Sequence, residues 1–390
     1  MGRQLIFFFQ PSLLLITVVS LLISIGALGF YNGWALPRWM EEAESWQSLE
    51  VHLWIFYLVF LFIILLTNRK SLQPNLQLPK FSFLPLIIFY LTSTIAAAGV
   101  AYINFPFASQ VAAAGFIGYC LQVANVENLK VRIFAYGTLF IPIALLLHDD
   151  KRDAIFLLLP LLLIELLQKP QIKIHIIILI KLLFLVMGLL ILIILATVLR
   201  AAEYYEIINL IDIFKAAKVY IFSDLFVGYF LQNIEATYTY FHTINAIEMW
   251  IVEKHEQLIG GSYLKGILIV FPREIFEFKP QKASYWYTLF YDEEYRMAGG
   301  SWAVSMFGEA YLNFQIFGVF VLVSILKFFD YLFYKYTLHS GHKDYLVNIP
   351  KLYLPVTFLD FSRGAGLDSV AIYVCVVAFT SLLIKLSVRY

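Results

Sequence analysis

Residues 174–199 read IHIIILIKLLFLVMGLLILIILATVL, an apolar run whose only ionisable side chains lie near its start. A transmembrane helix needs about 20 predominantly apolar residues, so this run is long enough to cross a bilayer. Over the whole chain 61% of residues are hydrophobic and 14% are charged. Soluble domains carry about 25% charged residues. The sequence therefore predicts an all-α, polytopic integral membrane protein.

Further stretches on either side have the length and apolarity of membrane spans. They are residues 5–30, 51–67, 83–103, 107–124, 131–148 and 153–168 before this run, and 307–333, 345–361 and 367–386 after it. The first stretch exceeds the roughly 7–15 residues of a signal-peptide core, so we expect a retained helix. The sequence thus predicts an integral membrane helix bundle of about ten spans.

These spans divide the chain into three parts. Residues 1–199 form an N-terminal transmembrane bundle of about seven spans. Residues 200–306 form one large external loop, and residues 307–390 form a C-terminal transmembrane bundle of about three spans. A loop of this length is usually functional, and its many aromatic residues indicate an ordered segment. Apolar residues at helical spacing over 237–258 predict that the loop contains interfacial helices.

Positive charges in the short loops set the orientation, because Lys and Arg accumulate on the cytoplasmic side. With the N-terminus inside, the basic loops at 69–80, 130–132 and 169–173 all face the cytoplasm. Both termini are then expected in the cytoplasm. The loop 200–306 and Arg363 are expected on the opposite side of the membrane.

The composition also disfavours several function classes. A net charge of +1 gives no sign of nucleic-acid binding. Cys120 and Cys375 lie inside apolar runs, which argues against a disulfide framework or a zinc site. The sequence shows no Walker loop, dinucleotide fingerprint, nucleophile elbow or metal-ligand spacing. We therefore expect chemistry that uses no cofactor and no metal.

Cations gather on the predicted outer side: Arg200 after the run 174–199, Arg273, Lys279 and Arg296 in the loop, and Arg363 between the last two spans. A guanidinium binds phosphate oxygens through two parallel hydrogen bonds. Such a set suits an anionic headgroup, above all the pyrophosphate of a lipid-linked substrate. The alternative is that each cation extends to the membrane surface or pairs with a nearby acid.

A second group of polar residues lies where the span 307–333 begins. Ser305, Glu309 and Asn313 are spaced by four residues, so a helix places them on one face. Gly308 and Gly318 allow another helix or a substrate to approach closely. Glu309 is either a carboxylate stabilised near a helix N-terminus or a general base that accepts a proton from a substrate hydroxyl.

Three motifs in these regions resemble those of the bacterial oligosaccharide repeat-unit polymerases, the Wzy-type O-antigen polymerases. FPREIFEFKP (271–280) resembles the family's Pro-Arg pattern, followed by an aromatic segment that ends in Lys-Pro. GEAYLNFQIFGVF (308–320) resembles its Gly-Glu-Ala-Tyr-x-Asn-Phe-Gly helix start, with Gln315 where glycine is expected. SRGAG (362–366) resembles its Arg-Gly pair, but Ala365 stands where an acid often follows, and Asp368 is the nearest substitute.

The resemblance implies a metal-independent glycosyltransferase at the outer, periplasmic face of the bacterial inner membrane. Its donor would be a growing glycan on undecaprenyl pyrophosphate and its acceptor a single repeat unit on the same lipid, giving O-antigen, capsule or exopolysaccharide chains. A chain-length regulator and a flippase of the same pathway are the implied partners, besides membrane lipids.

The resemblance also suggests roles for individual residues. Arg200, Arg273, Lys279, Arg296 and Arg363 would hold the departing pyrophosphate. Glu309 would activate the acceptor hydroxyl and act together with Arg273 and Arg363 in catalysis. Asn313 and Tyr311 would orient the acceptor.

Three other functions stay open on the sequence, one of which is a non-catalytic membrane scaffold that would leave the outer cations unexplained. An O-antigen ligase would share the arginine chemistry and transfer the finished glycan to a lipid A core. A lipid-linked oligosaccharide flippase or another transporter should show internal repeats and charges near the membrane midplane. The one-sided distribution of cations favours an enzyme.

Overall fold

The computed structural model describes residues 11–36, 47–67, 83–103, 108–149, 209–234, 236–253, 258–268 and 278–338, with scattered positions over 160–207 and 352–379. The ordered elements of these residues are helical, and no strand occurs among them. The predicted all-α class is therefore confirmed for the described part of the chain.

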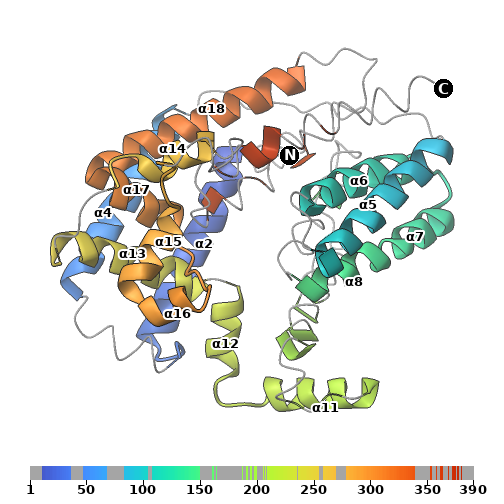
Figure 1. Ribbon diagram of the computed structural model, residues 1–390, viewed down its shortest axis with the longest axis horizontal. Helices are drawn as coiled ribbons and strands as arrows, with labels where there is room; N and C mark the ends of the chain where they lie inside the picture. Colours follow the sequence, from blue (N-terminus) through green and yellow to red (C-terminus); the bar gives the residue numbers. More distant parts are fainter. Residues whose placement is uncertain are drawn as a thin grey trace.

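The helices form two groups (Figure 1). One group contains α5 (Phe83–Ile103), α6 (Ala108–Val123), α7 (Leu129–Thr138) and α8 (Phe140–Asp149). The other contains α2 (Pro11–Tyr31), α4 (Gln47–Thr67), α12 (Phe226–Asn233), α13 (Ala236–Ile251), α14 (Gly261–Ile267), α15 (Ala283–Tyr291), α16 (Glu293–Met297), α17 (Met306–Phe314) and α18 (Gly318–Leu338). A further helix, α11 (Leu210–Ile221), lies at one end of the molecule.

Three helical segments in the described residues are long and apolar enough to cross a membrane: Leu49–Thr67, Phe83–Ile103 and Met306–Tyr331. The last of them contains α17, the turn Gln315–Phe317 and the first part of α18. The shorter apolar helices Leu15–Tyr31 and Ala108–Val123 coincide with two further predicted spans. Most of the predicted spans 153–168, 174–199, 345–361 and 367–386 lies outside the described residues. Membrane-compatible helices are thus present, and the count of ten stays a prediction.

The predicted span 131–148 is wrong as a single helix. Helix α7 ends at Thr138 and α8 begins at Phe140, with Leu139 in a turn between them. Pro142 in the first turn of α8 has no backbone N–H and therefore cannot donate the bond that would continue α7. Gly137 in the last turn of α7 further weakens helix continuity.

A carboxylate links the start of α2 to α18. Pro11 occupies the first position of α2, where its missing N–H is harmless. The Ser12 backbone N–H donates to Asp330 Oδ1 at 3.1 Å, and the Ser12 hydroxyl donates to Asp330 Oδ2 at 2.6 Å. Asp330 thus satisfies a helix N-terminus and places negative charge beside its dipole.

Helix α13 occupies the centre of the second group. The sequence predicted an interfacial helix here; the helix is present, but α2, α4, α12 and α17 pack against it and bury most of its residues. The predicted helix is therefore present, its place at the membrane surface stays a prediction, and its polar side chains have protein partners. The Thr243 hydroxyl, for example, pairs with the Ser305 hydroxyl, and His242 Nδ1 lies 2.7 Å from the Tyr287 hydroxyl.

The predicted span 307–333 is helical but interrupted. Helix α17 ends at Phe314, the turn Gln315–Phe317 follows, and α18 begins at Gly318. Gln315 has φ +54°, a left-handed backbone that non-glycine residues rarely adopt. A Cβ on Gly318 would overlap the carbonyl of Ala310, so the predicted close approach at this glycine is confirmed.

The left-handed backbone at position 315 leads to the first prediction. We expect Gln315→Gly to raise the free energy of unfolding by about 1 kcal/mol, because glycine adopts positive φ without steric cost. Gln315→Ala removes the same side chain but keeps the Cβ, so it should bring no such gain. Thermal unfolding of the detergent-solubilised variants measures both. Equal stability of the two variants would contradict the prediction.

Candidate functional site

The candidate site is built where α14 lies against α17. Gly260 has φ +78° and turns the chain into α14, and the Leu258 N–H donates to the Leu312 carbonyl at 3.2 Å. The Tyr263 ring stacks on Phe314 at 5.8 Å between ring centroids. These contacts hold the first turn of α14 beside the face of α17 that carries Glu309.

Ser262 joins the two predicted polar residues of α17. Its hydroxyl donates to Glu309 Oε1 at 2.7 Å and accepts from Asn313 Nδ2 at 2.8 Å. Asn313 also donates to the Glu309 carbonyl oxygen at 2.8 Å. The shared helix face predicted for Glu309 and Asn313 is therefore present. Ser305 caps α17 by accepting from the Gly308 N–H at 3.2 Å.

Several polar atoms of this cluster have no hydrogen-bond partner among the described residues. They are Glu309 Oε2, Asn313 Oδ1 and the Tyr263 hydroxyl. Glu309 is 2% exposed and Asn313 is 1% exposed, so bulk water does not satisfy these atoms. A buried polar group without a partner is costly and calls for a water, an ion or a ligand.

A buried carboxylate and two lysines lie beside this cluster. Asp368 Oδ2 lies 2.6 Å from Lys265 Nζ on α14 and 3.0 Å from Lys282 Nζ at the start of α15. The Asp368 side chain is 3% exposed, and its Oδ1 has no partner among the described residues. Lys265 and Lys282 are close enough to Glu309 for their charges to act on it.

Burial sets the protonation behaviour of these groups. It lowers the pKa of Lys265 to about 8, although the hydrogen bond to Asp368 opposes this shift. Burial also pulls down the pKa of Lys282, but the charge and the hydrogen bond of Asp368, with smaller contributions from Tyr285 and Lys265, together outweigh burial and leave that pKa above its ordinary value. For the Tyr263 hydroxyl, burial and then the charge of Glu309 raise the pKa well above its usual range.

Two other predicted site residues lie in different surroundings. The Arg296 guanidinium sits 4.1 Å above the Tyr285 ring and donates to the Gly300 carbonyl at 3.2 Å. Tyr311 packs against Phe56 of α4. It follows Glu309 by two positions, and because an α-helix has 3.6 residues per turn, the two side chains lie on opposite faces of α17. The structure therefore does not bring Tyr311 into the cluster of Glu309, Ser262 and Asn313, and its acceptor-orienting role stays a prediction.

Of the remaining predicted cations, only Lys279 lies in the described part of the chain. Arg200, Arg273 and Arg363 lie outside the described residues. Lys279 is described, and its charge contributes to the lowered pKa of Lys265.

The sequence analysis missed Ser262, Tyr263 and Lys265. A usable signal was present in GGSYLKGI (260–267), because a lysine between apolar residues of a membrane protein is expensive and usually functional. The pairing of Lys265 with Asp368 had no local signal, since the two residues are 103 positions apart.

The cluster combines groups that serve acid–base and anion chemistry. Glu309 can accept a proton, and the two lysines can stabilise a negative charge. Among the described residues, no three His, Cys, Asp or Glu side chains gather as metal ligands. A separate cavity of about 750 Å³ between α5 and α6 is lined by residues such as Leu91, Ile95 and Tyr102, and its lining contains no carboxylate, histidine, lysine or arginine, so it does not combine a carboxylate with cations.

The described part defines an all-helical protein with helices long and apolar enough to cross a membrane. Comparison with protein-family models, curated proteins and solved structures finds no match to this chain.

The lowered pKa of Lys265 leads to the second prediction. Between pH 8 and 10.5 the folded chain releases this proton while the unfolded chain keeps it, so Lys265 makes the folded state more stable as the pH rises. The gain is at most about 1.4 kcal/mol per pH unit. We expect the wild type to gain stability relative to Lys265→Met over this range in thermal unfolding. The exposed Lys215→Met serves as the control, and parallel curves for the wild type and Lys265→Met would refute the assignment.

Proposed function

We propose that this chain is a membrane glycosyltransferase that polymerises lipid-linked oligosaccharide repeat units at the outer face of the inner membrane. The observation that carries the proposal is the cluster of Glu309, Ser262 and Asn313 beside Lys265, Asp368 and Lys282. Glu309 and Asn313 belong to the region 308–320 that carries the motif resemblance. Lys282 follows the region 271–280 by two residues, and Asp368 follows SRGAG (362–366) by two residues.

The proposed reaction forms a bond between the acceptor hydroxyl oxygen and the anomeric carbon of the donor glycan. The bond from that carbon to the lipid pyrophosphate breaks, and the pyrophosphate leaves with the electron pair. Glu309 takes the proton of the hydroxyl. Ser262 supports this role because it occupies Oε1 and leaves Oε2 as the oxygen available to a substrate.

The leaving pyrophosphate requires positive charge, because it departs with additional negative charge. Lys265 and Lys282 both lie within 3.0 Å of Asp368 Oδ2, and their positive charges act on Glu309, which supports an anion site next to Glu309. Arg273 and Arg363 are proposed to complete this site, as the resemblance implies. Both substrates would reach it laterally between helices, since their lipid tails stay in the membrane.

The proposed arginine roles give the third prediction. We expect Arg273→Ala and Arg363→Ala each to abolish long glycan chains while the protein still inserts at normal levels, because the departing phosphates lose bidentate donors. Gel separation of the glycans by length measures the effect, and membrane immunoblots control for insertion. Unchanged chain-length distributions in both variants would exclude these residues as the pyrophosphate clamp.

Glu309 gives the fourth prediction. Glu309→Gln keeps a side-chain oxygen for Ser262 but removes the proton acceptor, so we expect polymerisation to fall about 100-fold or more. Glu294→Gln makes the same chemical change on the exposed surface of α16 and should leave the rate unaltered. The rate is measured with purified protein and lipid-linked repeat units. Full activity of Glu309→Gln would remove this residue as the base.

A gene deletion separates the proposed function from its alternatives. If the glycan ladder disappears while one repeat unit stays attached to the lipid A core, the chain is a polymerase. If all attached glycan disappears, the chain is a ligase or a flippase, and the proposal is wrong.

A further inference from the structure

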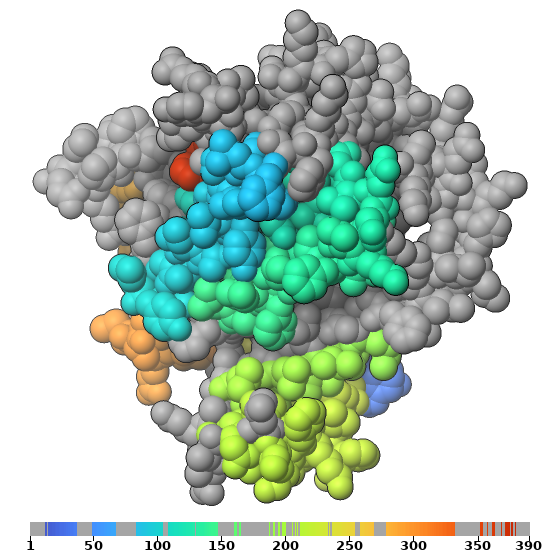
Figure 2. Space-filling model, turned by 90° about the vertical axis from the view of Figure 1, so that its right-hand side faces the viewer, coloured from blue at the N-terminus to red at the C-terminus, as the bar shows by residue number. Residues whose placement is uncertain are grey.

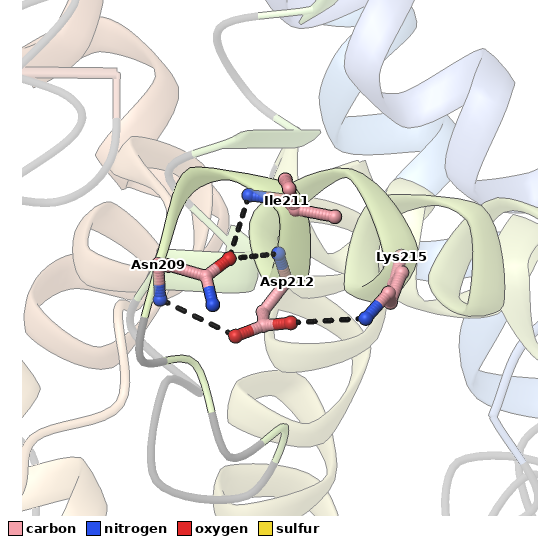
Figure 3. A network of polar contacts seen from close by, with 4 residues as sticks. All are labelled: Asn209, Ile211, Asp212 and Lys215. Carbon is pink, nitrogen blue, oxygen red and sulfur yellow. Dashed lines mark hydrogen bonds and ion pairs between the residues drawn. The ribbon is translucent and has the colours of Figure 1, made fainter.

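The side chains of Asn209 and Asp212 cap the start of helix α11. Asn209 Oδ1 accepts from the N–H groups of Ile211 and Asp212 at 2.9 Å and 3.1 Å, and Asp212 Oδ2 accepts from the Asn209 N–H at 3.3 Å (Figure 3). This capping box satisfies the N-terminal donors of the helix. Lys215 Nζ lies 3.2 Å from Asp212 Oδ1 on the next turn. The helix therefore starts at a fixed residue without help from a neighbouring element.

One face of α11 covers the end of an apolar segment. Ala216 and Tyr220 are 4% exposed and form a cluster with Ile194 and Val198. These two residues belong to the last turns of the run 174–199, which has the length and composition of a membrane span. Helix α11 thus lies where this apolar run ends, the position expected of a segment at the membrane surface.

The opposite face of α11 is exposed and carries both large apolar side chains and two lysines. Ile211 is 66% exposed, Phe214 is 71% exposed and Phe222, just after the helix, is 78% exposed. Counted from Lys218, Ile211 lies seven positions before it, Phe214 four and Lys215 three, and Phe222 lies four positions after it. Residues at these spacings share one face of a helix. Figure 2 shows the segment from α11 to α12 protruding at the lower edge of the molecule. An exposed apolar face of this kind marks an interaction surface.

We propose that this face of α11 lies in the headgroup layer of a phospholipid bilayer. Phe214 and Phe222 reach the upper acyl region, and the lysine stems extend so that Lys215 and Lys218 contact lipid phosphates. Lysine is depleted in the cores of protein–protein interfaces, whereas it is enriched on helices that lie on membranes. The two lysines therefore favour a lipid surface over a second protein copy. This inference is independent of the proposed catalytic function.

The fifth prediction tests this placement with the full chain in lipid nanodiscs. Nitroxide labels are attached at Phe214→Cys, Phe222→Cys and Asp224→Cys, each in a Cys120→Ala, Cys375→Ala background. We expect the labels at 214 and 222 to collide more often with oxygen, which partitions into hydrocarbon, than with an aqueous nickel chelate. The label at the exposed Asp224, in the turn after α11, should show the reverse order.

A second arm tests the lysines. Lys215→Gln and Lys218→Gln should each lower the membrane-bound fraction of α11 about fivefold in discs of anionic lipid, because each lysine near an anionic surface contributes about 1 kcal/mol. In discs of zwitterionic lipid the effect should be smaller. Labels at 214 and 222 that meet the chelate freely in both lipids would overturn the proposal. Labels shielded from both reagents, with cross-linked dimers, would instead identify a second copy as the occupant.

Discussion

The backbone turn at Gln315–Gly318 is the constraint on which the candidate site depends. A continuous helix over Met306–Tyr331 would carry the first nine residues along the axis of α18. The turn instead lets α17 take its own direction between α13 and α14, with Glu309 and Asn313 facing Ser262. Gly318 makes the turn sterically feasible, because a side chain there would overlap the Ala310 carbonyl. Backbone that departs from helix inside a membrane protein is tolerated where it is packed in protein.

Two energetically unfavourable features of the described structure lie close to this turn. Gln315 holds an unfavourable backbone conformation, and Glu309 keeps a buried oxygen without a partner six residues before it. Asp368 is better compensated, because two lysines share its charge. Each of these features lowers stability, and neighbouring packing has to offset it. Proteins tolerate such local violations mainly at functional sites, so their coincidence supports the location of the site independently of any motif.

The sequence predicted the helices well and their contacts poorly, for a physical reason. Hydrocarbon demands apolar side chains and complete backbone hydrogen bonding, so an apolar run such as 83–103 already defines a helix. Nothing comparable marks which face of α13 is buried, because Thr243 finds its partner Ser305 far along the chain. Glu309 and Asn313 were predictable from their spacing, whereas Lys265 and Asp368 meet only through the tertiary fold.

Position 315 is where this chain departs from the resembled motif, and its backbone conformation is one that favours glycine. The resembled helix start places glycine there, and this chain has glutamine, which weakens the match as a string of letters. The backbone at Gln315 nevertheless has φ +54°, the conformation that glycine adopts most easily. A residue inside a regular α-helix has a negative φ instead. The observation concerns backbone shape alone, and the resemblance of residues 308–320 stays a prediction, while the proposed chemistry rests on Glu309 and its neighbours.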